Sequence, residues 1–254
     1  MRKYLIVLLI IIPISWIVIT YDIIPTAFWS CVEFTHPTYF RELRIEWAQK
    51  PSDFLLRKLY SINVMRFSIA AYILAERGER RAINILVKKV KSNHVNTNIH
   101  FSACGALAQL SPEIAKGILG ELVEKYRKLT WNKMPNHNSA AYQRYENALH
   151  VLAVMKDERI YSICLKMAES GDRLEKESSM NGMLYHFDNH WEEVLPLYVK
   201  CLNDKNSYDI ASIAGIKNMK RPEAIPILEE FASKNSMYKR EVGEVVEYLK
   251  SLQK

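Results

Sequence analysis

The sequence predicts an all-α fold in which helix pairs stack one after another behind an N-terminal membrane span. The main observation is a register of apolar residues at steps of 33, 45, 32 and 32 positions: Leu74, Leu107, Leu152, Leu184 and Ile216. A second series lies twelve positions after four of these anchors: Leu86, Leu119, Cys164 and Leu228. A fixed period of this size is typical of stacked helical hairpins, because each hairpin buries its apolar face against the next.

The N-terminal segment, residues 1–21, predicts a signal anchor that stays attached to the chain. No charged side chain occurs from residue 4 to residue 20, and a helix of about 17 residues spans about 25 Å, near the minimum for a bilayer. A cleaved signal peptide needs a small-residue site shortly after the apolar core, and this sequence has no convincing one. A buried soluble helix would be expected to show a polar face, and none is present.

The basic residues around this segment predict its orientation. Arg2 and Lys3 precede it, and the next basic residue is Arg41. The positive-inside rule then places the N-terminus in the cytoplasm. We therefore expect a single-pass membrane protein that contacts the bilayer through residues 4–21, with the bulk of the chain outside the cytoplasm, in the periplasm if the source is a bacterium.

The remaining chain divides into a connector and a repeat array. Residues 22–61 predict a juxtamembrane connector that ends in two first helices, and residues 62–254 predict the array. An insertion at 129–138, rich in asparagine with a proline and a tryptophan, accounts for the one long step and predicts a projecting loop. Apolar periodicity predicts array helices at 62–76, 80–91, 96–110, 114–128, 139–155, 157–169, 174–187, 191–202, 208–219, 222–233 and 236–252.

Two kinds of motif carry a resemblance to a known repeat family. Residues 65–74 read MRFSIAAYIL, an arginine followed by alanines and a leucine, and Arg144 before Ala148 and Leu152 is a second copy. The stretches AIPIL at 224–228 and VLPL at 194–197 look like the first helix of such a unit.

These motifs resemble the short HEAT repeats of phycobilisome-lyase-like proteins, over residues 63–253. The resemblance implies an armadillo-like, right-handed α-solenoid of antiparallel helix pairs. It implies no particular activity: most members of this class bind proteins, and a few bind nucleic acid or a cofactor.

Composition and motifs give little support to catalysis or to a cofactor. The net charge of +7 is compatible with an acidic protein or anionic lipid, while export of the domain would disfavour nucleic acid as a partner. Phosphate-binding loops, nucleophile elbows and zinc-protease motifs are absent. His186, Asp188 and His190 lie close together, but in an expected turn rather than at helical spacing. We therefore expect no catalytic residues, no metal, no cofactor and no small-molecule ligand.

Protein binding is the predicted function, and its candidate contacts cluster at two places. Aromatic and polar residues follow the insertion, and others lie on later second helices, which would line the concave surface of a solenoid. The candidate partner-binding residues are Trp131, Tyr142, Gln143, Arg144, Tyr145, Asn181 and Tyr208.

Two alternatives remain open. One is an immunity-type protein that neutralises a toxin acting in the envelope. The other is a lyase-like or hydrolase-like enzyme with a site in the solenoid groove, which would require titratable side chains that converge on one pocket.

Overall fold

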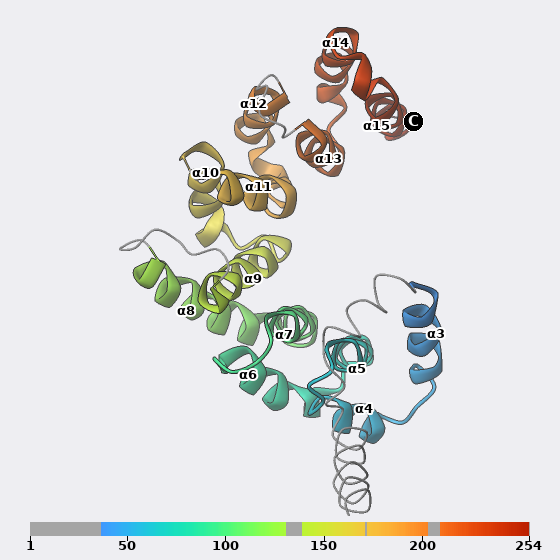
Figure 1. The fold of residues 1–254 in the computed structure, drawn as a ribbon, viewed down its shortest axis with the longest axis vertical. Coiled ribbons are helices and arrows are strands. Elements are labelled where there is room, and N and C mark those ends of the chain that lie inside the picture. The colour runs from blue at the N-terminus through green and yellow to red at the C-terminus, as the bar shows by residue number, and fades with distance from the viewer. Residues whose placement is uncertain (1–36, 131–138, 171, 203–208, 254) are drawn as a thin grey trace, which may run out of the picture. The chain divides into compact units, whose positions relative to one another are not determined.

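The computed structural model describes residues 37–130, 139–170, 172–202 and 209–253, and every regular element in these ranges is a helix (Figure 1). The all-α prediction is therefore confirmed for the described chain. The chain forms two compact units, residues 1–148 and 149–254. One helix, α9 (Ala140–Val154), runs across the boundary between them.

Unit 1 is built around α5 and α7. Helices α3 and α4 both contact α5, so residues 37–61 pack onto the first helix of the array, and α7 contacts α5, α6 and α8. The elements of unit 1 are α3 (Pro37–Trp47), α4 (Ser52–Lys58), α5 (Val64–Glu76), η1 (Arg80–Ala82), α6 (Ile83–Lys91), α7 (Thr97–Leu110), α8 (Pro112–Thr130) and the first part of α9.

Unit 2 consists of helix pairs separated by short 3-10 segments. Helix α10 contacts α11, α12 contacts α13 and α14 contacts α15, while α13 also contacts α11 and α15. Its elements are the end of α9, η2 (Glu158–Ile160), α10 (Tyr161–Ser170), α11 (Arg173–Gly182), η3 (Leu184–His186), η4 (Asp188–His190), α12 (Trp191–Leu202), α13 (Asp209–Met219), η5 (Pro222–Ala224), α14 (Ile225–Lys234), η6 (Ser236–Tyr238) and α15 (Lys239–Ser251).

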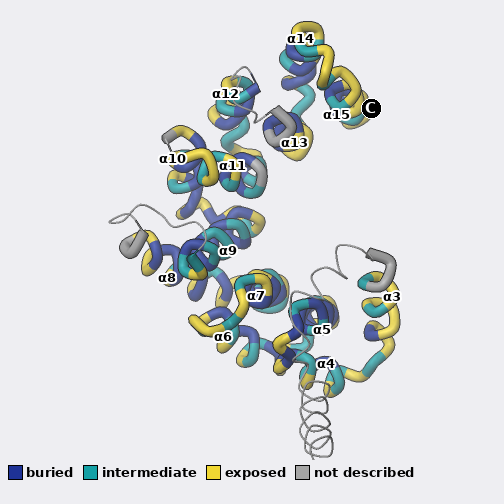
Figure 2. Tube along the Cα trace, viewed as in Figure 1, coloured by how far each residue is buried: buried dark blue, intermediate teal, exposed yellow. Residues whose placement is uncertain are grey.

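The apolar register forms the core of both units. Every anchor residue and every residue of the second series is at most 1% exposed. In Figure 2 the buried residues lie along the sides of the helices that face their neighbours. The register therefore identified core positions correctly on both sides of the unit boundary.

The interface between α5 and α7 is made of small side chains. Ala70, Ala71 and Ala103 are completely buried, and the hydroxyl groups of Ser68 and Ser102 are hydrogen-bonded at 2.6 Å. Small residues let two helix backbones approach closely.

A recurring turn follows three of the register anchors. Gly78, Lys156 and Lys220 each lie four positions after an anchor and adopt a positive φ of 66°, 54° and 54°. In two of these turns the next amide donates to the anchor carbonyl: Glu79 to Leu74 at 2.9 Å, and Asp157 to Leu152 at 3.0 Å. This six-to-one hydrogen bond is the Schellman ending of a helix, which satisfies carbonyl groups that the helix leaves open.

One predicted helix is shorter than expected. The pattern predicted a helix over 174–187, but α11 ends at Gly182 and the chain continues as η3 and η4. A Cβ atom on Gly182 would lie 2.7 Å from Nδ1 of His150, so this position must stay without a side chain while the histidine packs there. Glycine also weakens a helix, which favours an end at this point.

Two predictions concern residues that the structure does not describe. The predicted span, residues 4–21, lies outside the described ranges, and so do residues 131–138 of the predicted insertion. Helix α8 continues to Thr130, so the first two residues of the predicted insertion are helical. Within the described ranges, no helix is both long enough and apolar enough to cross a bilayer.

Candidate functional site

Three of the seven predicted contact residues have no described side chain. Trp131 and Tyr208 lie outside the described ranges. Asn181 lies near the end of α11, but its side chain is also outside the described part. The other four residues, 142–145, lie in the first turns of α9.

Arg144 is a buried residue that holds a neighbouring loop in place through hydrogen bonds. It is 4% exposed, and its Nη2 donates to the carbonyl oxygens of Asn93 and Val95, both at 2.7 Å. One turn later, Nδ2 of Asn147 donates to the carbonyl oxygen of Thr97 at 2.9 Å. Arg144 and Asn147 thus fasten the loop between α6 and α7 to α9. This burial leaves Arg144 little surface for a partner and gives no support to its predicted contact.

The neighbouring tyrosines are also part of the core. Tyr142 and Tyr145 are 1% and 2% exposed, with ring centroids 6.1 Å apart. Buried tyrosines of this kind fill space between helices. Gln143, between them, is partly exposed and is the one predicted contact with described surface available to a partner.

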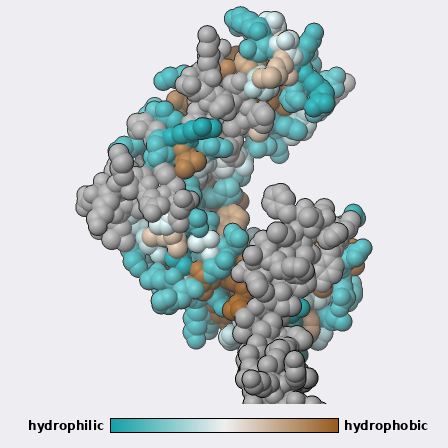
Figure 3. Space-filling model, in the orientation of Figure 1, coloured by the Kyte–Doolittle hydropathy of each residue, from teal (hydrophilic) through white to brown (hydrophobic). Residues whose placement is uncertain are grey.

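A different exposed surface lies on α5 and α7. Asn98, Phe101, Gly105 and Ala108 share one face of α7, because they follow helical spacing. Phe101 is 36% exposed. Tyr72 reaches across from α5, and its Oη lies 3.0 Å from the place that a Cβ on Gly105 would take. We call these five residues the α5–α7 face. Figure 3, which views one side of the molecule, shows apolar residues in small areas among hydrophilic ones.

Some basic residues of unit 1 are already engaged by other groups of the same unit. Arg77 donates to the carbonyl oxygens of Lys50 at 2.9 Å and Ala48 at 2.7 Å, and Arg81 forms ion pairs with Asp53 and Glu79. Lys88 and Lys91 remain on the exposed side of α6. These lysines follow helical spacing and form a basic stripe.

The charge of the chain is unevenly divided. Residues 1–148 contain 20 Lys and Arg against 11 Asp and Glu, a net charge of +9. Residues 149–254 contain 15 Lys and Arg against 17 Asp and Glu, a net charge of −2. Any attraction of the chain for anionic surfaces is therefore concentrated in unit 1.

Unit 2 contains a pocket of about 520 Å³ at the turns between its helices. It lies where η3 and η4 meet the end of α13 and the start of η5. We call it the turn pocket. Its lining residues are Lys156, Tyr185, His186, Asp188, Asn218, Met219, Lys220 and Arg221.

Asp188 organises two of the cations in the turn pocket. Its Oδ1 accepts from Nζ of Lys156 at 2.7 Å, and this hydrogen bond holds the pKa of the Asp188 carboxyl below its usual value. Nη2 of Arg221 donates to the backbone carbonyl of Asp188 at 2.8 Å. The Arg221 guanidinium also lies 5.4 Å from the ring centroid of Trp191, a cation–π distance.

The histidines near the pocket have different environments. Burial is the main cause that lowers the pKa of His186 to about 4, with His150 and Lys156 adding to it, so His186 is neutral at pH 7. Its Nε2 is buried and has no hydrogen-bond partner among the described residues. His190 instead stacks on Tyr161 with centroids 3.9 Å apart and lies 3.0 Å from Glu158. Nowhere in the described ranges do three metal-ligating side chains cluster.

Neither Cys104 nor Cys164 is suited to act as a nucleophile. Cys104 and Cys164 are completely buried, and burial raises the pKa of both thiols, that of Cys164 to about 12. Thiolate, the reactive form, is therefore disfavoured. The residues that line the turn pocket include no serine, threonine or cysteine. Its cations and neutral polar groups fit the binding of an anion better than acyl transfer.

The pocket cations were missed by sequence reasoning. A weak signal was present, because Lys156 and Lys220 each follow a helix end and lie two periods apart. Single lysines after helices are common, so the spacing becomes informative only once the turns are seen to meet.

Comparison of the sequence with protein-family models gives no match, and comparison with curated proteins gives no significant one. Function must therefore be inferred from the chain's own residues and their geometry.

Proposed function

We propose that this chain is a membrane-tethered, HEAT-like α-solenoid that binds another protein through its second helices. The supporting observation is the spacing of the contacts between successive hairpins. Hydrogen bonds join residues 34 positions apart between Ser68 and Ser102, and 32 apart between Tyr161 and Glu193. A separation this constant, found inside both units, supports stacking of equivalent hairpins, which presents a row of helices to a partner.

The α5–α7 face is the proposed centre of the partner-binding surface. It combines two aromatic side chains, Phe101 and Tyr72, with the small residues Gly105 and Ala108. Aromatic side chains give a partner apolar area, and aromatic residues are enriched at binding hot spots. Gln143 of α9 is retained as a contact in the same row of second helices.

Site-specific crosslinking in intact membranes tests this surface. A photoreactive amino acid replaces Phe101 in one variant and Lys88 of α6 in a matched control, because both positions are exposed and belong to the same unit. We expect a discrete crosslinked product from position 101 and much less from position 88. Equal products from both positions, or none from position 101, would reject the α5–α7 face.

Membrane attachment is tested separately by fractionation. The full chain should stay with membranes after alkaline carbonate extraction, and removal of residues 1–21 should release it. If the chain expressed at full length instead appears in the soluble fraction with a shortened N-terminus, the anchor is refuted. The crosslinking test of the partner surface does not depend on this result.

A further inference from the structure

The turn pocket of unit 2 carries an excess of positive charge in an otherwise slightly acidic unit. Lys156, Lys220 and Arg221 line it, and Asp188 is its one carboxylate. The local balance is therefore two positive charges, against −2 for residues 149–254 as a whole. Cations gathered from two separate turns create a local field opposite in sign to that of the unit that holds them.

The three cations of the turn pocket differ in how many of their hydrogen-bond donors are already engaged by other groups. Lys156 is paired with Asp188, and Arg221 uses one donor on the Asp188 carbonyl. The Lys220 ammonium has no ion pair or hydrogen bond within the described residues. A guanidinium has five donors, so Arg221 keeps most of its hydrogen-bonding capacity. The arrangement orients its cations on Asp188 and leaves donors available to a ligand.

The backbone of both lysines is strained. Lys156 and Lys220 are the non-glycine residues with positive φ in the described chain, both at 54°. This region of φ is unfavourable for a residue with a side chain, and glycine avoids that cost. Gly78 occupies the corresponding turn of unit 1. Strain at two positions that line one pocket points to a role for their side chains.

The neutral groups of the pocket complete a site for an anion. Asn218 supplies an amide and Tyr185 a hydroxyl to the lining of the pocket. We propose that the turn pocket binds a phosphate dianion, either free or as a phosphate monoester. Its two excess positive charges match the two negative charges of such a group, and phosphate accepts charge-assisted hydrogen bonds from Arg and Lys.

Titration of the full chain with two probes tests the proposal and separates the two sources. One probe is inorganic phosphate, and the other is a short peptide with one phosphoserine; sodium chloride at equal ionic strength is the reference. Chemical-shift changes of Asn218 and Arg221 report binding. We expect saturable binding that weakens as salt rises. Tighter binding of the peptide would indicate a phosphate carried by a protein, and tighter binding of inorganic phosphate a free ion.

Charge variants locate the site. Lys220→Gln should weaken phosphate binding about tenfold, because it removes a charge-assisted contact. Lys200→Gln, which removes an exposed charge from α12 outside the pocket, should leave binding unchanged. Lys220→Gly serves as a control for folding, because glycine is well suited to the positive φ at this position. This variant should lose phosphate binding to the same extent as Lys220→Gln. Absence of saturable binding by either probe, or equal weakening by Lys200→Gln, would overturn the proposal without affecting the partner surface of unit 1.

Discussion

The two units use the same register but pack it with different side chains. In unit 1, α5 and α7 meet through alanines and a pair of hydrogen-bonded serines. In unit 2, sulfur and aromatic side chains fill the equivalent space: Cys164 lies 3.6 Å from the sulfur of Met183, and buried Tyr198 donates to the carbonyl of Met180. Small side chains let helices pack closely, whereas larger and more flexible ones fill the gaps between them.

The units also differ in the kind of surface they offer. Unit 1 has a net charge of +9 with an aromatic face, and unit 2 has a net charge of −2 with one basic pocket. A single repeat pattern therefore sets the core while leaving surface chemistry free to diverge between neighbouring hairpins.

The largest effect is expected in unit 2 at Gly215. A Cβ there would lie 2.0 Å from the ring of Tyr198, whose side chain is completely buried. Gly215→Ala should therefore destabilise unit 2 by about 3 kcal/mol or more, since overpacking forces the ring from its site. Gly243→Ala, where the added methyl meets open space, should be neutral or stabilising. Hydrogen exchange should show reduced amide protection in unit 2 first. An equal reduction of protection in α5 and α7 would show that the units unfold together.

The next effect is expected in unit 1 at Arg144. Arg144→Met removes the donors for the carbonyls of Asn93 and Val95 and should cost about 2–3 kcal/mol. The matched control is Arg127→Met, which removes an exposed arginine from α8 and should change stability by no more than about 0.5 kcal/mol. Thermal unfolding measures both. A harmless Arg144→Met would show that these hydrogen bonds contribute little to the stability of unit 1.

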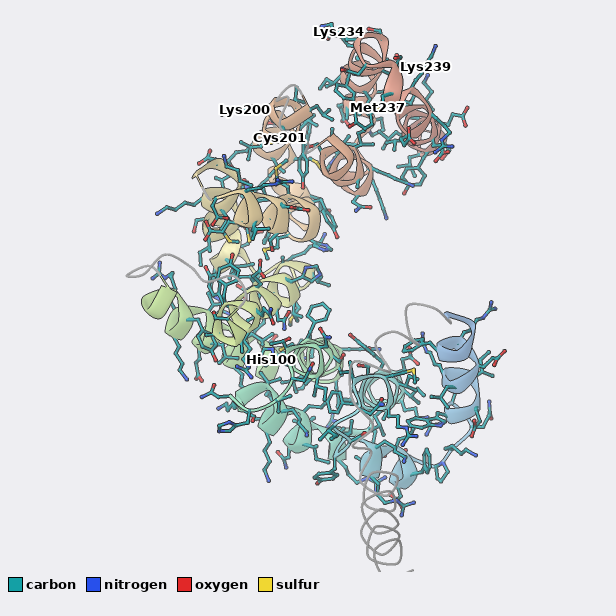
Figure 4. All side chains as sticks on the ribbon, viewed as in Figure 1. His100, Lys200, Cys201, Lys234, Met237 and Lys239 are labelled. Atoms are coloured by element: carbon teal, nitrogen blue, oxygen red, sulfur yellow. The ribbon has the colours of Figure 1, made fainter. Side chains whose placement is uncertain are left out.

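Acid should weaken unit 1 through His100 of α7, which Figure 4 labels. This side chain is completely buried. Burial, followed by the Arg144 charge, lowers the pKa of His100 to about 4. As the pH falls, His100 of the unfolded chain binds a proton near pH 6.5, whereas His100 of the folded chain binds it only near pH 4. Stability should fall across that window by up to about 3 kcal/mol. Unit 2 should also lose stability over this window, because burial lowers the pKa of His186 to about 4 as well. Unfolding between pH 7 and pH 4.5 measures this, and His100→Gln should flatten the acid loss.

The smallest effect concerns salt. Excess positive charge in unit 1 repels itself, and added salt screens that repulsion. Raising sodium chloride from 0.05 to 0.5 M should stabilise unit 1 relative to unit 2 by less than about 1 kcal/mol. Amide exchange in α6 and α14 compares the units within one sample. An equal shift in both helices would show that the charge asymmetry has no energetic consequence.

Sequence reasoning recovered the helices and core but not the sites. Helix α12 begins and ends at the predicted residues 191 and 202, because local periodicity determines such an element. The burial of Arg144 was not predictable, since its acceptors lie 49 and 51 positions away in a loop. The turn pocket was missed for the same reason: it exists only where separate turns meet, and periodicity carries no information about that meeting.

The positive φ of Lys156 and Lys220 has a consequence for how this chain can be altered. A sequence optimised for stability alone would place glycine or asparagine at both positions, as unit 1 does with Gly78. A thermostabilised version of the protein would therefore exchange these two lysines early and lose charge from the pocket as it gained stability. Selection for robustness and selection for the charge of unit 2 oppose each other at the same two backbone positions.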